Sequence, residues 1–313
     1  MDERVIPASG EAIARAAEIV RRGGLVAFPT ETVYGLGADA RDPSALARIF
    51  AVKGRPANHP LIVHLESAES IDDWAADVPE LARTLATRFW PGPLTLILHR
   101  ARGVPDAVTG GQDTVGLRVP SHDVALALIR ASGRAIAAPS ANRFGRVSPT
   151  TAEHVREDLG DDVELILDGG PCSVGVESTI VDLSGEVAAI LRPGGLSREA
   201  LEAAAGVSIP VRDTGVRASG TLESHYSPRA RVEVVEPQLL ASSLAAHRSS
   251  GTRVEVIAPE AATLYAAMRD ADRRGAEVIL VARPEPVGLG LAVADRLKRA
   301  AHGHSAEPGA DSP

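Results

Sequence analysis

The alternation of strand-like and helix-like segments constrains the fold of this chain most strongly. Short apolar runs alternate with segments of helical spacing from residue 10 to residue 206, and again from residue 230 to residue 302. The pattern is interrupted once, over residues 207–229. Strands and helices that alternate along a chain form α/β domains, because each helix covers a face of the sheet. We therefore predict two α/β domains joined by a linker.

The two domains are expected to contain different sheets. Residues 1–206 hold more strands than helices, and the consecutive strands near 178–192 indicate an antiparallel portion within a mixed sheet. The linker covers residues 207–229. Residues 230–302 contain three strand–helix units, which favour a small parallel, Rossmann-like sheet. Residues 303–313 are small and polar, and we predict a disordered tail there.

Three helix starts carry clear signals. Ser9 stands where an N-cap is needed for a helix over residues 10–22. Asp42 and Pro43 form a cap followed by proline at the first helical position. Ser197 caps a helix that has Glu199 in its first turn, where a negative charge suits the helix dipole.

Composition excludes several classes of protein. Cys172 is the single cysteine, so there is no disulfide framework and no cysteine-based zinc site. The net charge of −8 argues against a nucleic-acid footprint over the whole chain. The first residues do not resemble a signal peptide, and no stretch approaches the roughly 20 apolar residues of a membrane span. We expect a cytoplasmic protein with no membrane association.

Polar residues gather at the predicted strand ends, where α/β domains bind ligands. The five stretches concerned are "PTETVYGLG" (29–37), "KGRPANHPLIVH" (53–64), "GLRVP" (116–120), "APSANRFGRVSPT" (138–150) and "ESTIVDL" (177–183). None contains a Walker loop, a G-x-G-x-x-G turn, an H-E-x-x-H pair or a G-x-S-x-G elbow. Hydride transfer and serine hydrolysis therefore have no support. Hydroxyl and guanidinium groups suggest instead a phosphate compound and a small carboxylate.

Lys53 and Arg55 are the best phosphate candidates. They lie two residues apart, Pro56 and Pro60 after them keep the segment irregular, and Lys53 is one of only two lysines in the chain. A stiff loop with an ammonium and a guanidinium suits a polyphosphate. A solvated basic loop end is the alternative interpretation.

The other stretches also have two interpretations. Hydroxyl and amide groups after the strand at 134–140 fit a ligand site, but they also fit a hydrophilic turn that caps the next helix. Arg118 lies among apolar neighbours, so it is either paired, functional or on the solvent face of a half-buried strand. A lone histidine at a strand end, such as His64, is more often a structural residue than a ligand. The alternative to a site role is a strand-end cap for Arg192 and core packing for Tyr34.

Taken in order, these stretches resemble the YrdC-like threonylcarbamoyl-AMP synthases. The resemblance runs over residues 10–205 and includes "WPGPLT" and "LRPGG". It extends to the two-domain branch through "SHYSP" in the linker and "LYAAMRDADRRGAEVILV" and "GLGLAVADRLKRAA" after it. The resemblance implies a twisted, open sheet around a basic cleft.

The implied activity is that of a nucleotidyltransferase. Members of this family condense L-threonine, bicarbonate and ATP to threonylcarbamoyl-AMP and pyrophosphate, with Mg²⁺ carried by the ATP and no metal held by the protein. Their product passes to a separate transferase complex that modifies tRNA next to the anticodon. Direct tRNA binding by this chain is expected to be weak at most.

The resemblance also assigns residues. The positions that match threonine contacts are Thr32, His64, Arg118, Ala138 and Ser178. Those that match the nucleotide and phosphate side are Lys53, Arg55, His59, Thr114, Ser140, Asn142, Ser148, Arg192 and Tyr226. We expect Lys53, Arg55, Ser140 and Asn142 to act at the reacting groups. The family often has Asn where this chain has His59, and Met where it has Thr221, which leaves the contact at 59 or Asn58 open.

The linker is predicted to act as a lid. His225 and Tyr226 stand between Gly220 and Pro228, so the segment could swing over the cleft as a unit. Alternatively, Tyr226 only anchors the linker to the second domain.

Two other functions fit the same cleft. Related carbamoyltransferases form a carbamoyl-adenylate from carbamoyl phosphate and ATP. The other candidate is a module that binds structured RNA, although the low aromatic content of 3% disfavours it.

Overall fold

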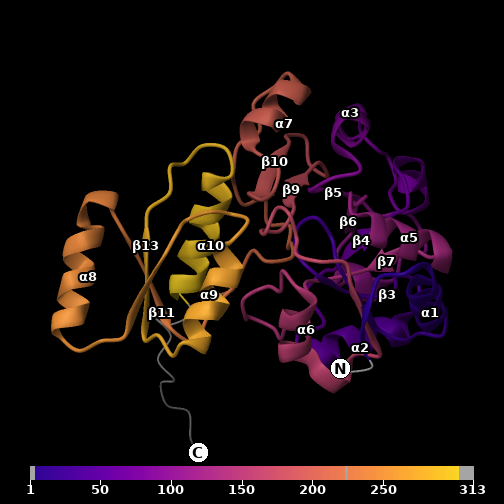
Figure 1. The fold of residues 1–313 in the computed structure, drawn as a ribbon. Helices are drawn as coiled ribbons and strands as arrows, with labels where there is room; N and C mark the ends of the chain where they lie inside the picture. Colours follow the sequence, from indigo (N-terminus) through magenta and orange to yellow (C-terminus); the bar gives the residue numbers. More distant parts are fainter. Residues whose placement is uncertain (1–3, 223–224, 303–313) are drawn as a thin grey trace, which may run out of the picture.

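The computed structural model describes residues 4–222 and 225–302. It contains two sheets, each in its own half of the chain, and α9 (Leu264–Arg273) and α10 (Gly290–His302) lie between them (Figure 1). The tail predicted to be disordered falls outside the described residues. No helix in the described ranges is long and apolar enough to cross a membrane.

The first sheet is mixed, as predicted. Its strand order is β1-β8-β2-β3-β7-β4-β6-β5-β9-β10. The strands are β1 (Val5–Pro7), β2 (Val26–Phe28), β3 (Gly35–Asp39), β4 (Ile62–His64), β5 (Leu94–His99), β6 (Thr114–Arg118), β7 (Ile136–Ala137), β8 (Leu165–Asp168), β9 (Thr179–Asp182) and β10 (Ala189–Arg192). β4 pairs with β6 in parallel, whereas β9 and β10 are antiparallel. The expected antiparallel portion near 178–192 is thus confirmed.

Helices cover this sheet and begin where the local signals predicted. They are α1 (Gly10–Arg21), α2 (Pro43–Lys53), α3 (Glu80–Phe89), α4 (Asp106–Thr109), α5 (Asp123–Ser132), α6 (Ala152–Leu159) and α7 (Arg198–Ala205), with short 3₁₀ turns at Ala68–Asp73 and Gly160–Asp162. The side chains of Ser9, Asp42 and Ser197 accept hydrogen bonds from the first-turn amides of α1, α2 and α7. These caps satisfy amides that have no partner within the helix.

The second sheet is parallel, as the three strand–helix units predicted. β11 (Arg231–Val235) and β12 (Val254–Ile257) flank β13 (Val278–Ala282). The 3₁₀ turn Pro237–Leu239 leads into α8 (Leu240–Ser249), which covers the outer face (Figure 1). α9 and α10 cover the face that looks toward the first domain.

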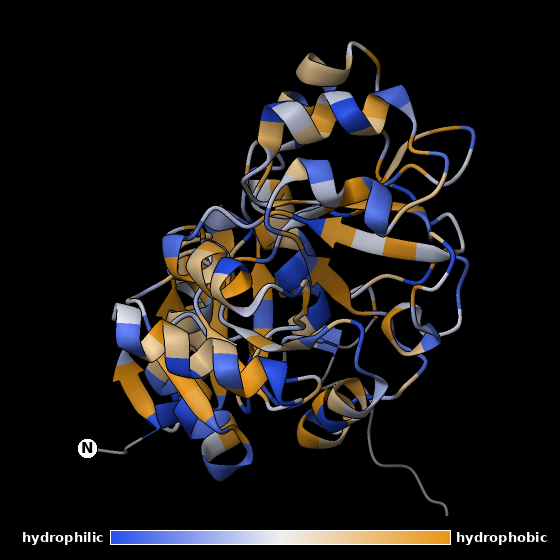
Figure 2. Cartoon of the chain, turned by 90° about the vertical axis from the view of Figure 1, so that its right-hand side faces the viewer, coloured by the Kyte–Doolittle hydropathy of each residue, from blue (hydrophilic) through white to orange (hydrophobic). Residues whose placement is uncertain are grey.

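The hydrophobic core continues across the domain boundary. Within each domain the strands are mainly apolar and the helices are apolar on one side, as the hydropathy colours show (Figure 2). One cluster joins Val33, Val147 and Val176 of the first domain to Tyr265 and Met268 of α9. Burial of this shared apolar surface holds the second domain against the end of the first sheet. Gly220, His225 and Tyr226 of the linker are buried near this boundary, whereas much of residues 207–217 is exposed.

Candidate active site

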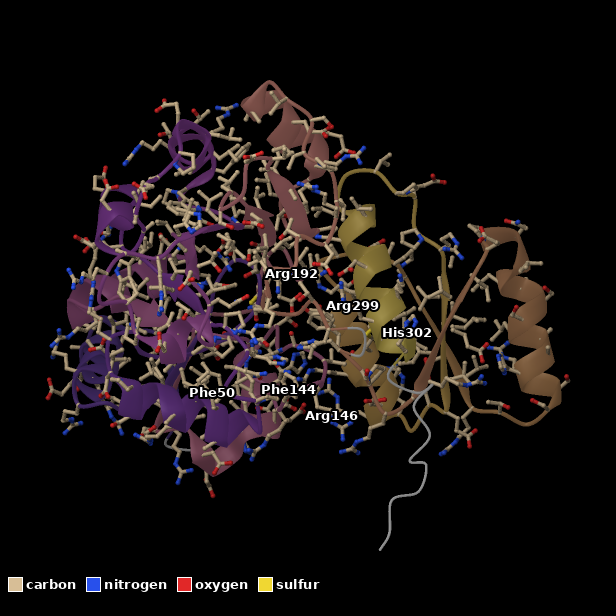
Figure 3. The ribbon with its side chains drawn as sticks, turned by 180° about the vertical axis from the view of Figure 1, so that it is seen from behind. Phe50, Phe144, Arg146, Arg192, Arg299 and His302 are labelled. Carbon is tan, nitrogen blue, oxygen red and sulfur yellow. The ribbon has the colours of Figure 1, made fainter. Side chains whose placement is uncertain are left out.

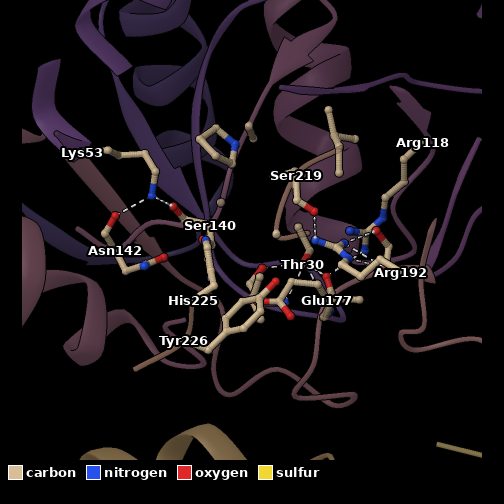
Figure 4. A pocket seen from close by; sticks show the side chains of 18 of the residues that line it. Thr30, Lys53, Arg118, Ser140, Asn142, Glu177, Arg192, Ser219, His225 and Tyr226 are labelled. Atoms are coloured by element: carbon tan, nitrogen blue, oxygen red, sulfur yellow. Dashed lines mark hydrogen bonds between the residues drawn. The ribbon is translucent and has the colours of Figure 1, made fainter. Parts of the chain in front are cut away.

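A small cavity lies where the linker meets the strand ends of the first sheet (Figure 4). β4, β6 and β10, the segment after β7 and the linker each contribute to its wall. The lining residues are Thr30, Thr32, Val33, Gly35, Lys53, Arg55, Ile62, His64, Arg118, Ala138, Pro139, Ser140, Asn142, Phe144, Glu177, Ser178, Arg192, Ser219, Gly220, His225 and Tyr226. The cavity volume is about 40 Å³. Ligand pockets usually measure about 300–1,000 Å³, so this cavity is far smaller than a typical ligand pocket.

Three buried cations on the wall of the cavity lack an acidic partner. Lys53, Arg55 and Arg192 are only 3%, 6% and 2% exposed, and none forms an ion pair with any residue the structure describes. Burial, together with the charges of neighbouring guanidinium groups, lowers the pKa of Lys53 well below its usual value and that of Arg55 to about 10. Buried charges without partners are unfavourable in a folded protein. An anionic ligand would relieve this cost.

Lys53 also holds the loop that follows β7. It stands at the C-terminal end of α2, and its Nζ donates to the carbonyl oxygens of Ser140 and Asn142, at 2.6 Å to Ser140 (Figure 4). The Asn142 side chain donates to the carbonyls of Arg143 and Arg146, at 2.7 and 2.9 Å. The loop at 138–146 is therefore kept in place by side chains that face the cavity.

Arg118 differs from the other cations because it has a carboxylate partner. Its Nη2 donates to Glu31 at 2.7 Å and to the Thr32 hydroxyl at 2.9 Å. Its Nε donates to the Gly92 carbonyl at 3.3 Å. These contacts fix the guanidinium plane at the end of β6, and Nη1 forms no hydrogen bond to a described residue. The alternative of a solvent-facing Arg118 is wrong, since the side chain is buried.

Two histidines of the cavity are uncharged near neutral pH. Burial and, to a smaller extent, the positive charge of Arg118 lower the pKa of His64 to about 3. Burial also lowers the pKa of His225 to about 3. The Nδ1 atoms of both rings lack a hydrogen-bond partner in the described structure. Each ring can therefore accept or donate one bond to a ligand without carrying charge.

Ser178 and Arg192 form the far wall of the cavity. The Ser178 hydroxyl lies 2.8 Å from that of Thr95, and its carbonyl accepts from Arg192 Nη2 at 2.8 Å. Arg192 Nη1 donates to the carbonyl of the linker residue Ser219 at 2.8 Å. Arg55 Nη2 lies 3.4 Å from the Ser219 hydroxyl. Ser219 of the linker thus accepts hydrogen bonds from two of the three unpaired cations, Arg192 and Arg55.

Tyr226 belongs both to the cavity wall and to the domain boundary. Its ring is 1% exposed, its hydroxyl lacks a partner among the described residues, and its backbone has φ of 61°. The centroid of its ring lies 4.0 Å from that of the His225 ring and 5.7 Å from that of Tyr265 of α9, on which it stacks. The two interpretations of Tyr226, lid and anchor, are therefore compatible.

Most of the residues predicted from the sequence line this one cavity. The cavity brings together Thr32, Lys53, Arg55, His64, Arg118, Ala138, Ser140, Asn142, Ser178, Arg192, His225 and Tyr226. His59, Thr114 and Ser148 do not line it. His59 packs edge-on against Phe144, and Thr114 borders a separate small cavity beside Ser219.

Sequence reasoning missed Glu177, the only carboxylate among the described lining residues. It accepts hydrogen bonds from Ser148 at 2.6 Å, from Tyr265 at 2.8 Å and from Arg296 at 2.7 Å. Burial acts to raise its pKa, but the charges of Arg296 and Arg192 outweigh burial and lower the pKa to about 2. The acid directly before a buried strand was a visible signal. Its partners in the second domain were not, because they lie 88 and 119 residues away in sequence.

The donor set does not fit a metal held by the protein. The described residues contain no group of three or more His, Cys, Asp or Glu side chains that could hold an ion. Both oxygens of Glu177 are already engaged. A cation such as Mg²⁺ would therefore enter with a polyphosphate, held by phosphate oxygens and water.

Comparison with known proteins matches both halves of the chain. Residues 18–194 match the family described as telomere recombination, which groups Sua5, YciO and YrdC proteins. Residues 196–302 match the family described as threonylcarbamoyl-AMP synthase, C-terminal domain.

Three relatives illustrate the similarity. The threonylcarbamoyl-AMP synthase of Pyrococcus abyssi is 46% identical over 91% of this chain and 92% of its own. The crystal structure of P. abyssi Sua5 complexed with L-threonine is 43% identical and has a TM-score of 0.90, covering 96% of this chain and 97% of that one. A threonylcarbamoyl-AMP synthase from Idiomarina loihiensis matches only 49% of this chain, yet 83% of its own, at 38% identity. This chain belongs to the threonylcarbamoyl-AMP synthase family, in its two-domain Sua5 branch.

Proposed function

We propose that this threonylcarbamoyl-AMP synthase condenses L-threonine, bicarbonate and ATP in the cleft under the linker. The observation that carries the proposal is the set of three buried, unpaired cations, Lys53, Arg55 and Arg192. Their charges match the triphosphate of ATP, which is the most anionic of the three substrates. The ATP brings Mg²⁺ with it.

The nucleotide side of the site is formed by the unpaired cations and the loop after β7. Arg55 and Arg192 would exchange Ser219 for phosphate oxygens, and Lys53 would add its third N–H to them. Ser140, Asn142 and Tyr226 complete this side of the wall.

Three further nucleotide residues lie outside the cavity. Thr114 borders a small cavity beside Ser219 of the linker, and His59 packs on Phe144, which in turn contacts His225, so we propose that both contact ATP only when the linker is displaced. Ser148 would act through Glu177, to which it donates.

The threonine side is formed by Arg118 and its neighbours. The Nη1 group of Arg118 would bind the substrate carboxylate while Glu31 and Thr32 hold the guanidinium plane. His64, Ala138 and Ser178 would bind the hydroxyl and the amine of threonine. L-threonine is the ligand named for the P. abyssi structure, whose fold this chain shares.

The chemistry needs positioning and charge neutralisation more than a protein nucleophile. The threonine amine adds to the carbon of bicarbonate, and loss of water gives the carbamate. A carbamate oxygen then attacks the α-phosphorus of ATP, and the bond to pyrophosphate breaks. The buried cations stabilise the negative charge that moves onto the leaving group. No catalytic triad is required.

Closure of the linker would protect the reaction. The carbamate and the mixed anhydride product are both lost to water, and exclusion of water from the cavity prevents this. A cavity of about 40 Å³ has no room for ATP, so the linker must open for substrates to enter and for product to leave. We propose that the product then passes, in the cytoplasm, to a separate transferase complex that modifies tRNA.

Pyrophosphate release tests the proposed reaction. We expect the protein to release pyrophosphate only when ATP, threonine and bicarbonate are all present. Release with carbamoyl phosphate in place of threonine and bicarbonate would favour the carbamoyltransferase alternative. Salt-dependent binding of structured RNA without pyrophosphate release would favour the RNA-binding alternative.

The role of Arg118 is tested by substitution with lysine, which keeps a positive charge beside Glu31. Loss of the guanidinium fork removes a charge-assisted hydrogen bond worth about 1.5–3 kcal/mol. We expect Arg118→Lys to raise the KM for threonine about 10- to 150-fold with little change in the KM for ATP. A folded variant with a normal KM for threonine would show that this assignment is wrong.

The lid is tested by a pair of glycine substitutions in the linker. Gly215 and Gly220 both have positive φ, of 79° and 74°, so alanine strains the backbone at both. Only at Gly220 would the new Cβ meet other groups, at 2.1 Å from the Tyr226 hydroxyl and 2.8 Å from Arg192 Nη1. We expect Gly220→Ala to lower kcat/KM at least about tenfold, and Gly215→Ala to change it less than about twofold. Equal activity of the two variants would contradict the lid.

A further inference from the structure

The C-terminal domain has no evident part in the chemistry, since no described side chain of α8, α9 or α10 lines the cavity. The threonylcarbamoyl-AMP synthase of Idiomarina loihiensis also matches only about half of this chain. We propose that the domain acts as a clamp, in which Tyr265 and Arg296 position Glu177 and Tyr226 for the closed site. This inference rests on the proposed closure of the linker over the nucleotide.

Glu177 is the point where the clamp reaches the cavity. The carboxylate lines the cavity. Its oxygens accept hydrogen bonds from Ser148 of the first domain and from Tyr265 and Arg296 of the second. The next residue along the chain is Ser178, which contacts Arg192. A shift of Glu177 would therefore move the wall that carries one of the unpaired cations.

Arg296 is a fully buried charge whose contacts all lie at the domain boundary. Its side chain is 0% exposed. Besides Glu177, it donates to the Pro193 carbonyl at 3.0 Å and to Asp295 at 2.6 Å. Its guanidinium carbon lies 5.0 Å from the centre of the Tyr226 ring. Buried charged networks of this kind specify one geometry, because any other arrangement leaves a charge without a partner.

Tyr226 needs such support. A tyrosine with φ of 61° is in the left-handed region, which side chains other than glycine rarely adopt. Conformations of this kind persist only when their surroundings enforce them. The surroundings here include the ring of Tyr265 at 5.7 Å between ring centroids, nearly parallel at 23°, and the guanidinium of Arg296. Both belong to the second domain.

A second arginine of α10 holds the linker from its outer side. Arg299 Nη1 donates to the carbonyl of Thr221 at 2.6 Å and also to that of Leu222. Asp295 forms ion pairs with both Arg296 and Arg299, and so links the contact at Tyr226 to the contact at Thr221. Arg192 holds the carbonyl of Ser219 from the first domain, so both domains grip this short segment near their boundary (Figure 3). The C-terminal domain thus contacts the linker on both sides of residues 223–224.

Substitutions in the full chain separate the clamp from simple domain packing. Tyr265→Phe removes one hydrogen bond to Glu177 and keeps the aromatic stack. Arg296→Lys keeps the charge, and Arg296→Met removes it. Arg274→Gln is the control, because Arg274 is exposed at the end of α9 and pairs only with Glu255 among described residues. Each variant is measured for kcat, for the KM of ATP and of threonine, and for amide hydrogen exchange in the linker.

The clamp predicts effects on closure. We expect Tyr265→Phe to raise the KM for ATP about three- to tenfold and linker exchange about tenfold, with normal protection in β11 to β13. Arg296→Met should give larger changes, and Arg296→Lys should restore part of the loss. Arg274→Gln should behave as the unchanged protein. If Arg296→Met does not fold, Tyr265→Phe and Arg296→Lys decide the matter.

Two results would overturn the clamp. One is that the Tyr265→Phe and Arg296→Lys variants both fold and both leave the KM for ATP and the amide exchange of the linker unchanged. The other is increased exchange spread over the whole second domain with unchanged kinetics, which indicates packing alone. Hydrogen exchange needs no turnover, so it tests the clamp even if pyrophosphate release fails and the proposed reaction is wrong.

Discussion

The buried ion pair between Glu177 and Arg296 is the interaction on which the rest of the site depends. The two residues lie 119 positions apart and belong to different domains, yet Nε and Oε2 are 2.7 Å apart and both side chains are excluded from solvent. A buried pair of this kind is tolerated only when other hydrogen bonds satisfy both groups. Ser148 and Tyr265 do so for the carboxylate, and Pro193 and Asp295 accept from Nη1 of the guanidinium, whereas its Nη2 has no partner among the described residues. Because these partners come from both domains, separating the domains would leave a charge unpaired at the cavity wall.

The buried cations of the site fall into two groups, those with a carboxylate partner and those without one, and the second group marks where the nucleotide is expected to bind. Arg118 and Arg296 each have a carboxylate partner that holds the guanidinium in place, and in our proposal Arg118 offers only its Nη1 to the substrate. Lys53, Arg55 and Arg192 have no carboxylate partner in the described structure, and they line the small cavity together with residues of the linker. The linker offers these cations only the neutral groups of Ser219. A triphosphate is a far better partner for them, so nucleotide binding and displacement of the linker are expected to be coupled.

Local features were predictable from the sequence, and contacts between distant segments were not. Ser9, Asp42 and Ser197 cap helices through neighbouring amides, and the three strand–helix units gave the parallel second sheet. The resemblance to a family brought most of the cavity residues together by their motifs. It did not reveal that His59 and Thr114 lie outside the lining, because the set of residues that face the cavity depends on where the linker lies. Nor could it find Glu177 with its partners in α9 and α10, since no local pattern links an acid to an arginine of another domain.

The central claim is that the linker closes the site and must open before the nucleotide can enter. The most direct test is the rate of binding of a fluorescent ATP analogue, measured by rapid mixing over a wide range of analogue concentrations. If opening precedes binding, the observed rate will level off at high concentration, at the rate of linker opening. The Gly220→Ala variant should reach a higher plateau, because its linker is held less firmly. An observed rate that rises in proportion to concentration throughout, and equally in both proteins, would contradict the claim.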